Sequence, residues 1–84
     1  MVTGTTINVL YFARVAELIG QREEAWPLAQ PTTVSELLTQ LEARYPALAP
    51  ASKLKIAVNQ YHAGHDRVVE PGDEVAVFEP VTGG

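Results

Sequence analysis

Two glycines, Gly83 and Gly84, end the sequence a few residues after its last apolar segment. Because glycine has no side chain, a backbone of this kind can pass through a narrow channel with protein close on all sides. The α-carboxylate of Gly84 is a poor electrophile until it is converted to an acyl-adenylate, from which a thiol or persulfide sulfur displaces AMP. We therefore interpret this carboxylate as the reactive group of the chain; the alternative is a frayed terminus without a function.

The groups needed to activate such a carboxylate must come from another protein. The sequence has no P-loop and no glycine-rich turn between a strand and a helix, so it offers no recognisable site for ATP. It also has no cysteine, which excludes disulfides, thiolate metal sites, ligation of an iron-sulfur cluster and cysteine catalysis. Sulfur for any sulfur chemistry must therefore be supplied by a partner.

The histidines His62 and His65, followed by Asp66, are a second group of residues with possible chemistry. They can be interpreted as metal ligands, as an acid/base pair or as solvated residues of a turn. In a short turn containing Gly64, histidines three apart do not share the rigid face that helical spacing provides. We favour solvated turn residues and predict no metal site.

Three carboxylates and one serine complete the candidates for catalysis. Glu70, Asp73 and Glu74 flank a Pro-Gly turn, where acidic residues are common for reasons of local hydrogen bonding and solvation. Ser35 falls inside a helix-capping motif, and nothing resembles a nucleophilic triad. The chain by itself therefore carries no evident catalytic machinery. For the aromatic residue Trp26 we predict a core or edge-strand position.

Length and composition indicate one folded domain. The chain has 84 residues, of which 46% are hydrophobic and 19% are charged, as expected for a globular protein that commits its apolar residues to one core. Its net charge of −4 and only six lysines and arginines argue against binding of nucleic acid. The first residues show no signal-peptide pattern and no apolar run approaches a membrane span, so we expect a cytoplasmic protein without a membrane partner.

Periodicity and turn residues predict the elements that position the tail. Alternation predicts a strand at 6–12 with Ile7, Val9 and Tyr11 on one face and Leu10 and Phe12 on the other. A capping box of Thr33 and Glu36 starts an amphipathic helix that Pro46 stops. The remaining expected elements are a helical segment at 13–19 ended by Gly20, an edge strand at 22–28 with Pro27, a loop at 46–50, a strand at 54–60, a turn around Gly64, a short edge strand at 67–69, a turn at Pro71 and Gly72, and a strand at 74–78.

This order of elements predicts an α+β fold of the β-grasp, or ubiquitin-like, type. Right-handed crossover places the main helix on one face of a mixed sheet of four to five strands, with the first and last strands adjacent and parallel. We expect the domain to span 1–78 and a flexible tail to span 79–84. The tail would leave a central strand and extend roughly 20 Å at about 3.3 to 3.6 Å per residue.

Four segments in this order carry a resemblance to a known family. They are VLYFARVAELIG, TVSELLTQLEARYP, AVNQ and PGDEVAVFEPVTGG, and together they cover nearly the whole chain. In order and spacing they resemble the small, sulfur-carrying subunits of molybdopterin synthase, of the ubiquitin-like MoaD/ThiS type.

The resemblance implies a function for the tail. It implies that an ATP-dependent, ubiquitin-activating-like adenylyltransferase activates Gly84 and that a sulfur donor protein supplies the sulfur of a C-terminal thiocarboxylate. The small subunit would bind no cofactor directly, and ATP would be used by the activating partner. The tail would then enter the large subunit of a heterotetrameric synthase, with Pro80, Val81 and Thr82 lining the channel and Gly83 beside the reacting carboxylate. There the sulfur would pass to cyclic pyranopterin monophosphate.

The resemblance also implies a surface for the partner. Phe12 and Phe78 match aromatic positions of the family's partner-binding patch, and His62 falls where the family often has an aliphatic residue. The alternative is that both phenylalanines belong to the core. Ala16 stands where the family usually has arginine, so a salt bridge made by that arginine is absent here unless Arg14 replaces it.

The sequence is also compatible with three other functions. A sulfur carrier of the thiamine pathway also ends in Gly-Gly, but such carriers are usually shorter and lack the FARVAELIG segment. A ubiquitin-like modifier that conjugates to lysines would share the chemistry up to the adenylate. A β-grasp interaction module with an inert tail would tolerate deletion of Gly84.

Overall fold

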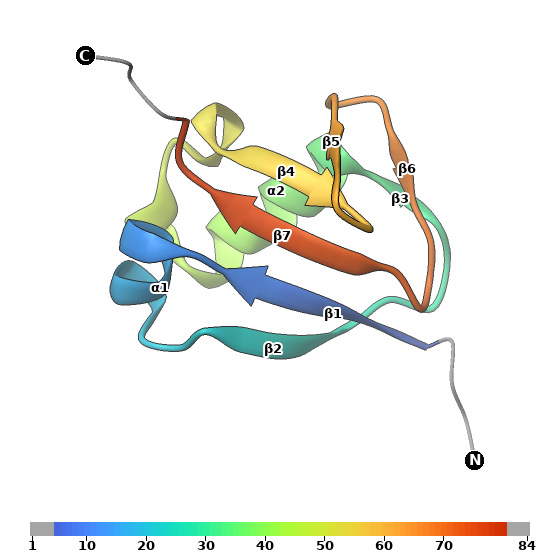
Figure 1. The fold of residues 1–84 in the computed structure, drawn as a ribbon, viewed down its shortest axis with the longest axis horizontal. Helices are drawn as coiled ribbons and strands as arrows, with labels where there is room; N and C mark the ends of the chain where they lie inside the picture. Colours follow the sequence, from blue (N-terminus) through green and yellow to red (C-terminus); the bar gives the residue numbers. More distant parts are fainter. Residues whose placement is uncertain (1–4, 81–84) are drawn as a thin grey trace.

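The structure, a computed structural model, describes residues 5–80 of the chain (Figure 1). Its elements are β1 (Thr6–Tyr11), α1 (Ala13–Ile19), β2 (Glu23–Pro27), β3 (Thr32–Thr33), α2 (Val34–Arg44), the 3₁₀ turns η1 (Pro46–Leu48) and η2 (Ala51–Lys53), β4 (Lys55–Val58), β5 (Tyr61–Ala63), β6 (Val68–Val69) and β7 (Glu74–Phe78). No helix of the described part is long and apolar enough to cross a membrane.

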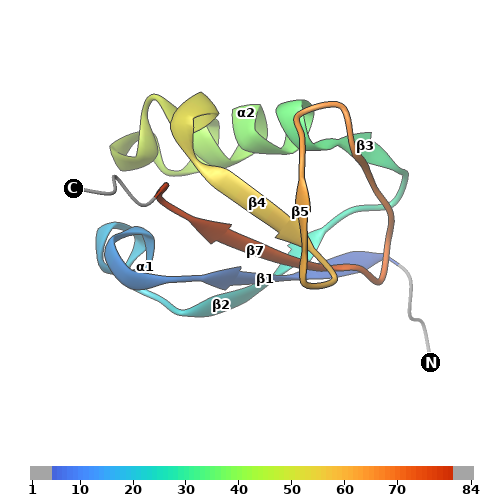
Figure 2. The same ribbon diagram turned by 45° about the horizontal axis from the view of Figure 1, so that its top comes forward.

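Five strands form one mixed sheet in the order β2-β1-β7-β4-β5, and β3 and β6 form a separate two-stranded ribbon. β1 and β7 are parallel neighbours, as predicted, while the other pairs in the large sheet are antiparallel. Figure 2 shows α2 lying across one face of this sheet. This is the predicted α+β arrangement of a β-grasp fold.

The core lies between the sheet and α2. Alternate residues of the central strands point toward α2 and are buried, among them Ile7 and Val9 of β1 and Val75 and Val77 of β7. The apolar stripe of α2 meets them with Val34, Leu37, Leu38 and Leu41, all buried. Two-residue periodicity in the strands and helical periodicity in α2 thus converge on one core.

Local signals set the ends of the helices. The Thr33 side chain accepts a hydrogen bond from the Glu36 amide (3.1 Å), and Glu36 Oε1 accepts one from the Thr33 amide (3.2 Å), which confirms the capping box. Gly20 ends α1 in the left-handed region with φ of 87°, as predicted.

The strand β2 lies at one edge of the sheet, as predicted from Pro27, which belongs to it. Trp26 of the same strand is buried.

The predicted strand at 54–60 is wrong at its C-terminal end. β4 stops at Val58 because Asn59 and Gln60 adopt positive φ angles of 51° and 75° and form a two-residue hairpin turn. The Asn59 side chain stabilises this turn: its Oδ1 accepts from the Glu74 amide (3.0 Å) and its Nδ2 donates to Asp73 Oδ1 (3.1 Å).

The prediction of which strand forms the second edge of the sheet was also wrong. We predicted that 61–66 would form a turn around Gly64 and that 67–69 would form an edge strand. Instead β5 pairs with β4 and is the edge of the large sheet, whereas β6 pairs with β3. The turn near Gly64, where the Arg67 amide donates to the Gly64 carbonyl, follows β5. The predicted loop at 46–50 contains the 3₁₀ turn η1.

A polar cluster ties β1, β2 and the end of α2 together. The hydroxyls of Tyr11 and Tyr45 each donate to Glu24 Oε1 at 2.7 Å, and Gln21 Nε2 donates to the Tyr45 hydroxyl at 2.8 Å. Arg44 lies 3.7 Å from the other oxygen of Glu24. Burial and the hydrogen bond to Glu24 raise the pKa of Tyr11 far above its ordinary value of 10.0, and the same causes raise the pKa of Tyr45.

We expect the free energy of unfolding to fall as the pH rises above 10. In that range an unfolded chain loses the phenolic proton of Tyr11 while the folded chain keeps it, so the unfolded state binds fewer protons. Tyr11→Phe should make this fall shallower by up to about 1.4 kcal/mol per pH unit. Urea unfolding between pH 9 and pH 11 measures the slope, with the exposed Tyr61→Phe as control. Equal slopes in both variants would show that Tyr11 is not responsible.

Candidate functional site

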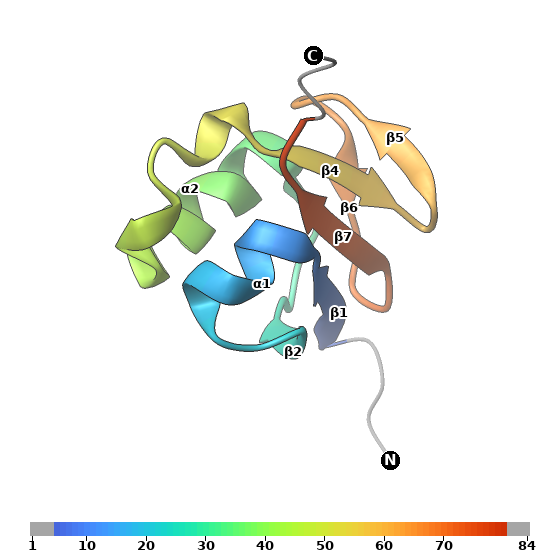
Figure 3. The same cartoon turned by 60° about the vertical axis from the view of Figure 1, so that its left-hand side comes forward.

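The C-terminal tail begins at the centre of the sheet. β7 is the middle strand of five and ends at Phe78, after which Glu79 and Pro80 are the last residues that the structure describes. Figures 1 and 3 show this end of β7 beside α1. The candidates Val81, Thr82, Gly83 and Gly84 lie outside the described residues, so their roles stay predictions.

The strand that carries the tail is firmly held. Val75 and Val77 are buried, and β7 is hydrogen-bonded to β1 on one side and to β4 on the other. The amide of Phe12 donates to the carbonyl of Val77 (3.1 Å), one residue before β7 ends. Arg14 of α1 lies 3.7 Å from the Glu79 carboxylate at an exposed position. The starting point of the tail is therefore fixed relative to the sheet.

The face of the sheet opposite α2 carries a row of apolar side chains beside this starting point. Strand register aligns Leu10 of β1 with Ala76 of β7, Ala76 with Ala57 of β4, and Ala57 with His62 of β5. All four therefore point to the same side of the sheet. The two alanines form a shallow floor between the larger side chains at either end.

Phe12 and Phe78 stand next to this row at the end from which the tail leaves. Tyr11 pairs with Val77, so the residues that follow them, Phe12 and Phe78, are neighbours. Phe12 is 48% exposed and Phe78 is partly buried, so neither belongs to the buried core, and the alternative core position is wrong. The ring of His62 meets that of Phe78 edge to face, with centroids 5.7 Å apart.

We call these six residues the outer patch: Leu10, Phe12, Ala57, His62, Ala76 and Phe78. The structure brings together the three residues predicted to bind a partner, Phe12, His62 and Phe78. Sequence reasoning placed Leu10 on the same face as Phe12 but missed Ala57 and Ala76, for which the only signal is alternation with buried neighbours. An apolar patch of this kind, left uncovered at the root of the C-terminal tail, is suited to binding another protein.

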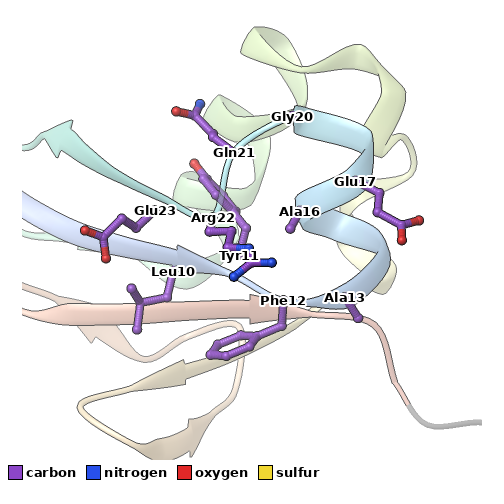
Figure 4. A pocket seen from close by; sticks show the side chains of 10 residues that line it. All are labelled: Leu10, Tyr11, Phe12, Ala13, Ala16, Glu17, Gly20, Gln21, Arg22 and Glu23. Carbon is purple, nitrogen blue, oxygen red and sulfur yellow. The ribbon is translucent and has the colours of Figure 1, made fainter.

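A groove of about 640 Å³ adjoins the patch between the end of β1 and α1 (Figure 4). Figure 4 shows Tyr11 pointing away from Leu10 and Phe12, as alternation along β1 requires. Ala16 lines the groove, whereas Arg14 does not and instead lies against Glu79. Arg14 therefore does not occupy the position at which the family usually has arginine.

The other residues considered for catalysis or metal binding either stabilise the fold or are exposed to solvent. Asp73 Oδ2 accepts from the Glu70 amide (2.9 Å), so this carboxylate stabilises the turn before β7. His62 lies on β5 and not in a turn, while His65 and Asp66 are exposed in the turn that follows. Ser35 is exposed in the first turn of α2. Within residues 5–80, no group of three or more histidine, aspartate and glutamate side chains gathers as it would around a metal ion.

Comparison with known proteins identifies the family. The sequence profile of the ThiS family matches residues 9–84, which include the outer patch and the Gly-Gly end. The chain belongs to the ThiS family. Two relatives of this ThiS-family chain are sulfur carrier subunits of molybdopterin synthase. The human subunit is 39% identical over all of both chains, and that of Escherichia coli is 42% identical over 93% of this chain and 99% of its own.

A solved structure supports the fold of the ThiS-family chain. Small archaeal modifier protein 1 of Haloferax volcanii superimposes with a TM-score of 0.78 and 26% identity over 93% of this chain and all of that one. This chain therefore shares its ubiquitin-like β-grasp fold with a protein named as a modifier, and sequence similarity with proteins named as sulfur carrier subunits.

Proposed function

We propose that this protein is the sulfur carrier of molybdenum cofactor biosynthesis and that the carboxylate of Gly84 is its working group. The observation that carries the proposal is the position of the outer patch, which lies uncovered beside the root of a tail held by the central strand. Full-length identity to sulfur carrier subunits of molybdopterin synthase supports the same function.

The first step activates the tail. A ubiquitin-activating-like adenylyltransferase joins an oxygen of the Gly84 carboxylate to the α-phosphate of ATP and releases pyrophosphate. A persulfide of a sulfur donor protein then attacks the carbonyl carbon, AMP leaves, and reduction of the resulting acyl disulfide by a thiol frees the thiocarboxylate. ATP is bound by the partner, and the carrier itself holds no cofactor.

The second step delivers the sulfur within the cytoplasm. The outer patch binds the large subunit of molybdopterin synthase, and Phe12, Phe78 and His62 lose water at this contact. Pro80, Val81 and Thr82 line the channel that leads Gly83 and Gly84 to cyclic pyranopterin monophosphate. Each carrier donates one sulfur and returns to the carboxylate, so the dithiolene needs two carriers, in keeping with a heterotetramer.

The role of the folded domain is to position the tail. Because the strand that precedes the tail ends at Phe78 in the folded domain, a partner bound at the outer patch receives the terminal carboxylate at a raised effective concentration. The absence of side chains at Gly83 and Gly84 then allows close approach of the surrounding backbone. The chemistry itself is performed by groups of the partner proteins.

A second candidate function is that of a ubiquitin-like modifier. The observation that favours it is the structural similarity to small archaeal modifier protein 1. A modifier passes its activated carboxylate to the amine of a lysine and forms an isopeptide bond. A sulfur carrier of the thiamine pathway would instead pass its sulfur to a different small acceptor, with the same carrier chemistry.

Intact mass spectrometry tests the proposal. The chain is incubated with the adenylyltransferase, ATP and a sulfur donor, and we expect a mass change that corresponds to replacement of one oxygen by sulfur. The same reaction without ATP is the control and should leave the mass unchanged. Failure to form either an adenylate or a thiocarboxylate, or accumulation of lysine-linked conjugates in its place, would contradict the proposed function.

A further inference from the structure

A second groove lies at the root of the tail, on the side away from the outer patch. It has a volume of about 440 Å³ and runs between α1 and the two 3₁₀ turns η1 and η2. Glu79 and Pro80, the last described residues of the tail, line it as well. Figure 3 shows α1 next to the end of β7. We call it the tail-root groove.

The lining of the tail-root groove is largely aliphatic. Leu48 of η1 and Leu54, which follows η2, are buried and line its inner part. Leu18 of α1 also lines it and is 38% exposed, one of four large apolar side chains that are exposed within residues 5–80. Pro50 adds a further apolar surface without an amide donor. The groove is thus suited to aliphatic side chains of another chain.

The groove is lined by more positively charged than negatively charged side chains. Arg14 is matched by Glu79 at 3.7 Å, while the exposed Lys53 has no carboxylate within 4.0 Å among the described residues. The groove therefore carries a positive charge in excess, although the whole chain has a net charge of −4. A segment that complements it would carry a carboxylate next to aliphatic residues.

We propose that the tail-root groove binds an extended aliphatic segment with one carboxylate, and that this segment belongs to the large subunit that takes the tail. The inference rests on the proposed function. A protein that encloses residues 81–84 in a channel must come close to Pro80 and Glu79, which are already part of the groove. The partner would then hold the tail root from two sides, with the outer patch on one and the groove on the other.

The charge in the groove is tested by Lys53→Glu, with Arg67→Glu as the matched control. Both residues are exposed and both changes alter the net charge equally, but Arg67 lies in the turn between β5 and β6 and does not line the groove. We expect Lys53→Glu to weaken binding of the full chain to a molybdopterin synthase large subunit about tenfold or more, and Arg67→Glu less than about threefold. The difference should shrink in 1 M salt, where the Debye length is about 3 Å.

The apolar part is tested by Leu18→Asn, with Val68→Asn as control. Both replace an exposed aliphatic side chain by the same polar one, and only Leu18 lines the groove. We expect weaker binding for Leu18→Asn alone, with circular dichroism confirming that all four variants fold. Equal affinities within each pair, while Phe78→Ala still weakens binding, would overturn this inference and leave the proposed function intact. Failure of the unaltered chain to bind the large subunit would overturn both.

Discussion

We expect deletion of Gly84 to abolish sulfur transfer and to leave the free energy of unfolding unchanged. The deletion moves the terminal carboxylate by one residue, so an activated tail no longer reaches the position that the partner's active site is built to receive. Stability should not change because the identified core lies between Ile7 and Val77, and the last strand ends at Phe78. Sulfur transfer is measured as product formed by the large subunit, and stability by thermal unfolding.

Substitution of the same residue makes the test finer. Gly84→Ala keeps the length of the tail and adds one methyl group where the carboxylate must pass close to backbone, and we expect it to abolish transfer as well. Gly64→Ala is the matched control, because a Cβ at this exposed position meets nothing closer than Asp66 Oδ1 at 3.5 Å. Transfer at the unaltered rate by the Gly84 deletion would support the reading of an inert tail, and loss of thermal stability would place the terminus in the fold.

We expect Phe78→Ala to weaken binding to the large subunit by about 2 to 4 kcal/mol, or about 30- to 700-fold in affinity. The Phe78 ring contacts His62 within the outer patch and remains partly exposed in the isolated chain, so much of its burial must occur on association. Its loss from the free protein should cost less than the 3 to 5 kcal/mol that is typical of a fully buried phenylalanine. Calorimetric titration and urea unfolding give the two energies.

The control for this prediction is another exposed aromatic residue of the same sheet. Tyr61 of β5 is 74% exposed and lies next to His62 in the chain, but alternation directs it to the opposite face. Tyr61→Ala should leave the affinity nearly unchanged, while Phe12→Ala should weaken it as Phe78→Ala does. A Phe78→Ala protein that unfolds, or that loses as much stability as binding energy, would instead assign this ring a structural role.

Most of the fold could be predicted because strong local patterns agree with it. Alternation in β1 and β7, the Thr33 capping box and the left-handed Gly20 each appear in the sequence and in the structure. Burial on one side of the strands and helical spacing in α2 then leave few ways to enclose a core in a chain of this length. The parallel contact between β1 and β7 followed from the same constraint.

The hairpin between β4 and β5 could not be predicted from the usual signal. Two-residue turns with positive φ angles favour Asn-Gly, whereas this chain has Asn59 followed by Gln60. The conformation is stabilised by the Asn59 side chain, which donates a hydrogen bond to Asp73 and accepts one from the Glu74 amide, both far away in sequence. Without that tertiary contact, Gly64 was the more obvious turn, so the strand ends and the second sheet edge were placed wrongly.

Only part of the candidate site could be predicted, because the rest of it also depends on contacts between residues far apart in sequence. The chemistry proposed for the tail stays a prediction that rests on residue type and position, because the absence of side chains at Gly83 and Gly84 is visible in the sequence itself. The outer patch depends on register between four strands, and Ala57 and Ala76 belong to it only because Leu10 and His62 lie in the same row. The tail-root groove requires α1, η1 and η2 to meet, which no local pattern specifies.

The most direct test of the central claim is a reconstitution with the Gly84 thiocarboxylate. The protein in this form is mixed with a molybdopterin synthase large subunit and cyclic pyranopterin monophosphate, and both molybdopterin and the mass of the carrier are followed. We expect molybdopterin to form while the carrier returns to the mass of its carboxylate. No product from an intact thiocarboxylate, with a large subunit that works with its own small subunit, would contradict the assignment to the pterin pathway.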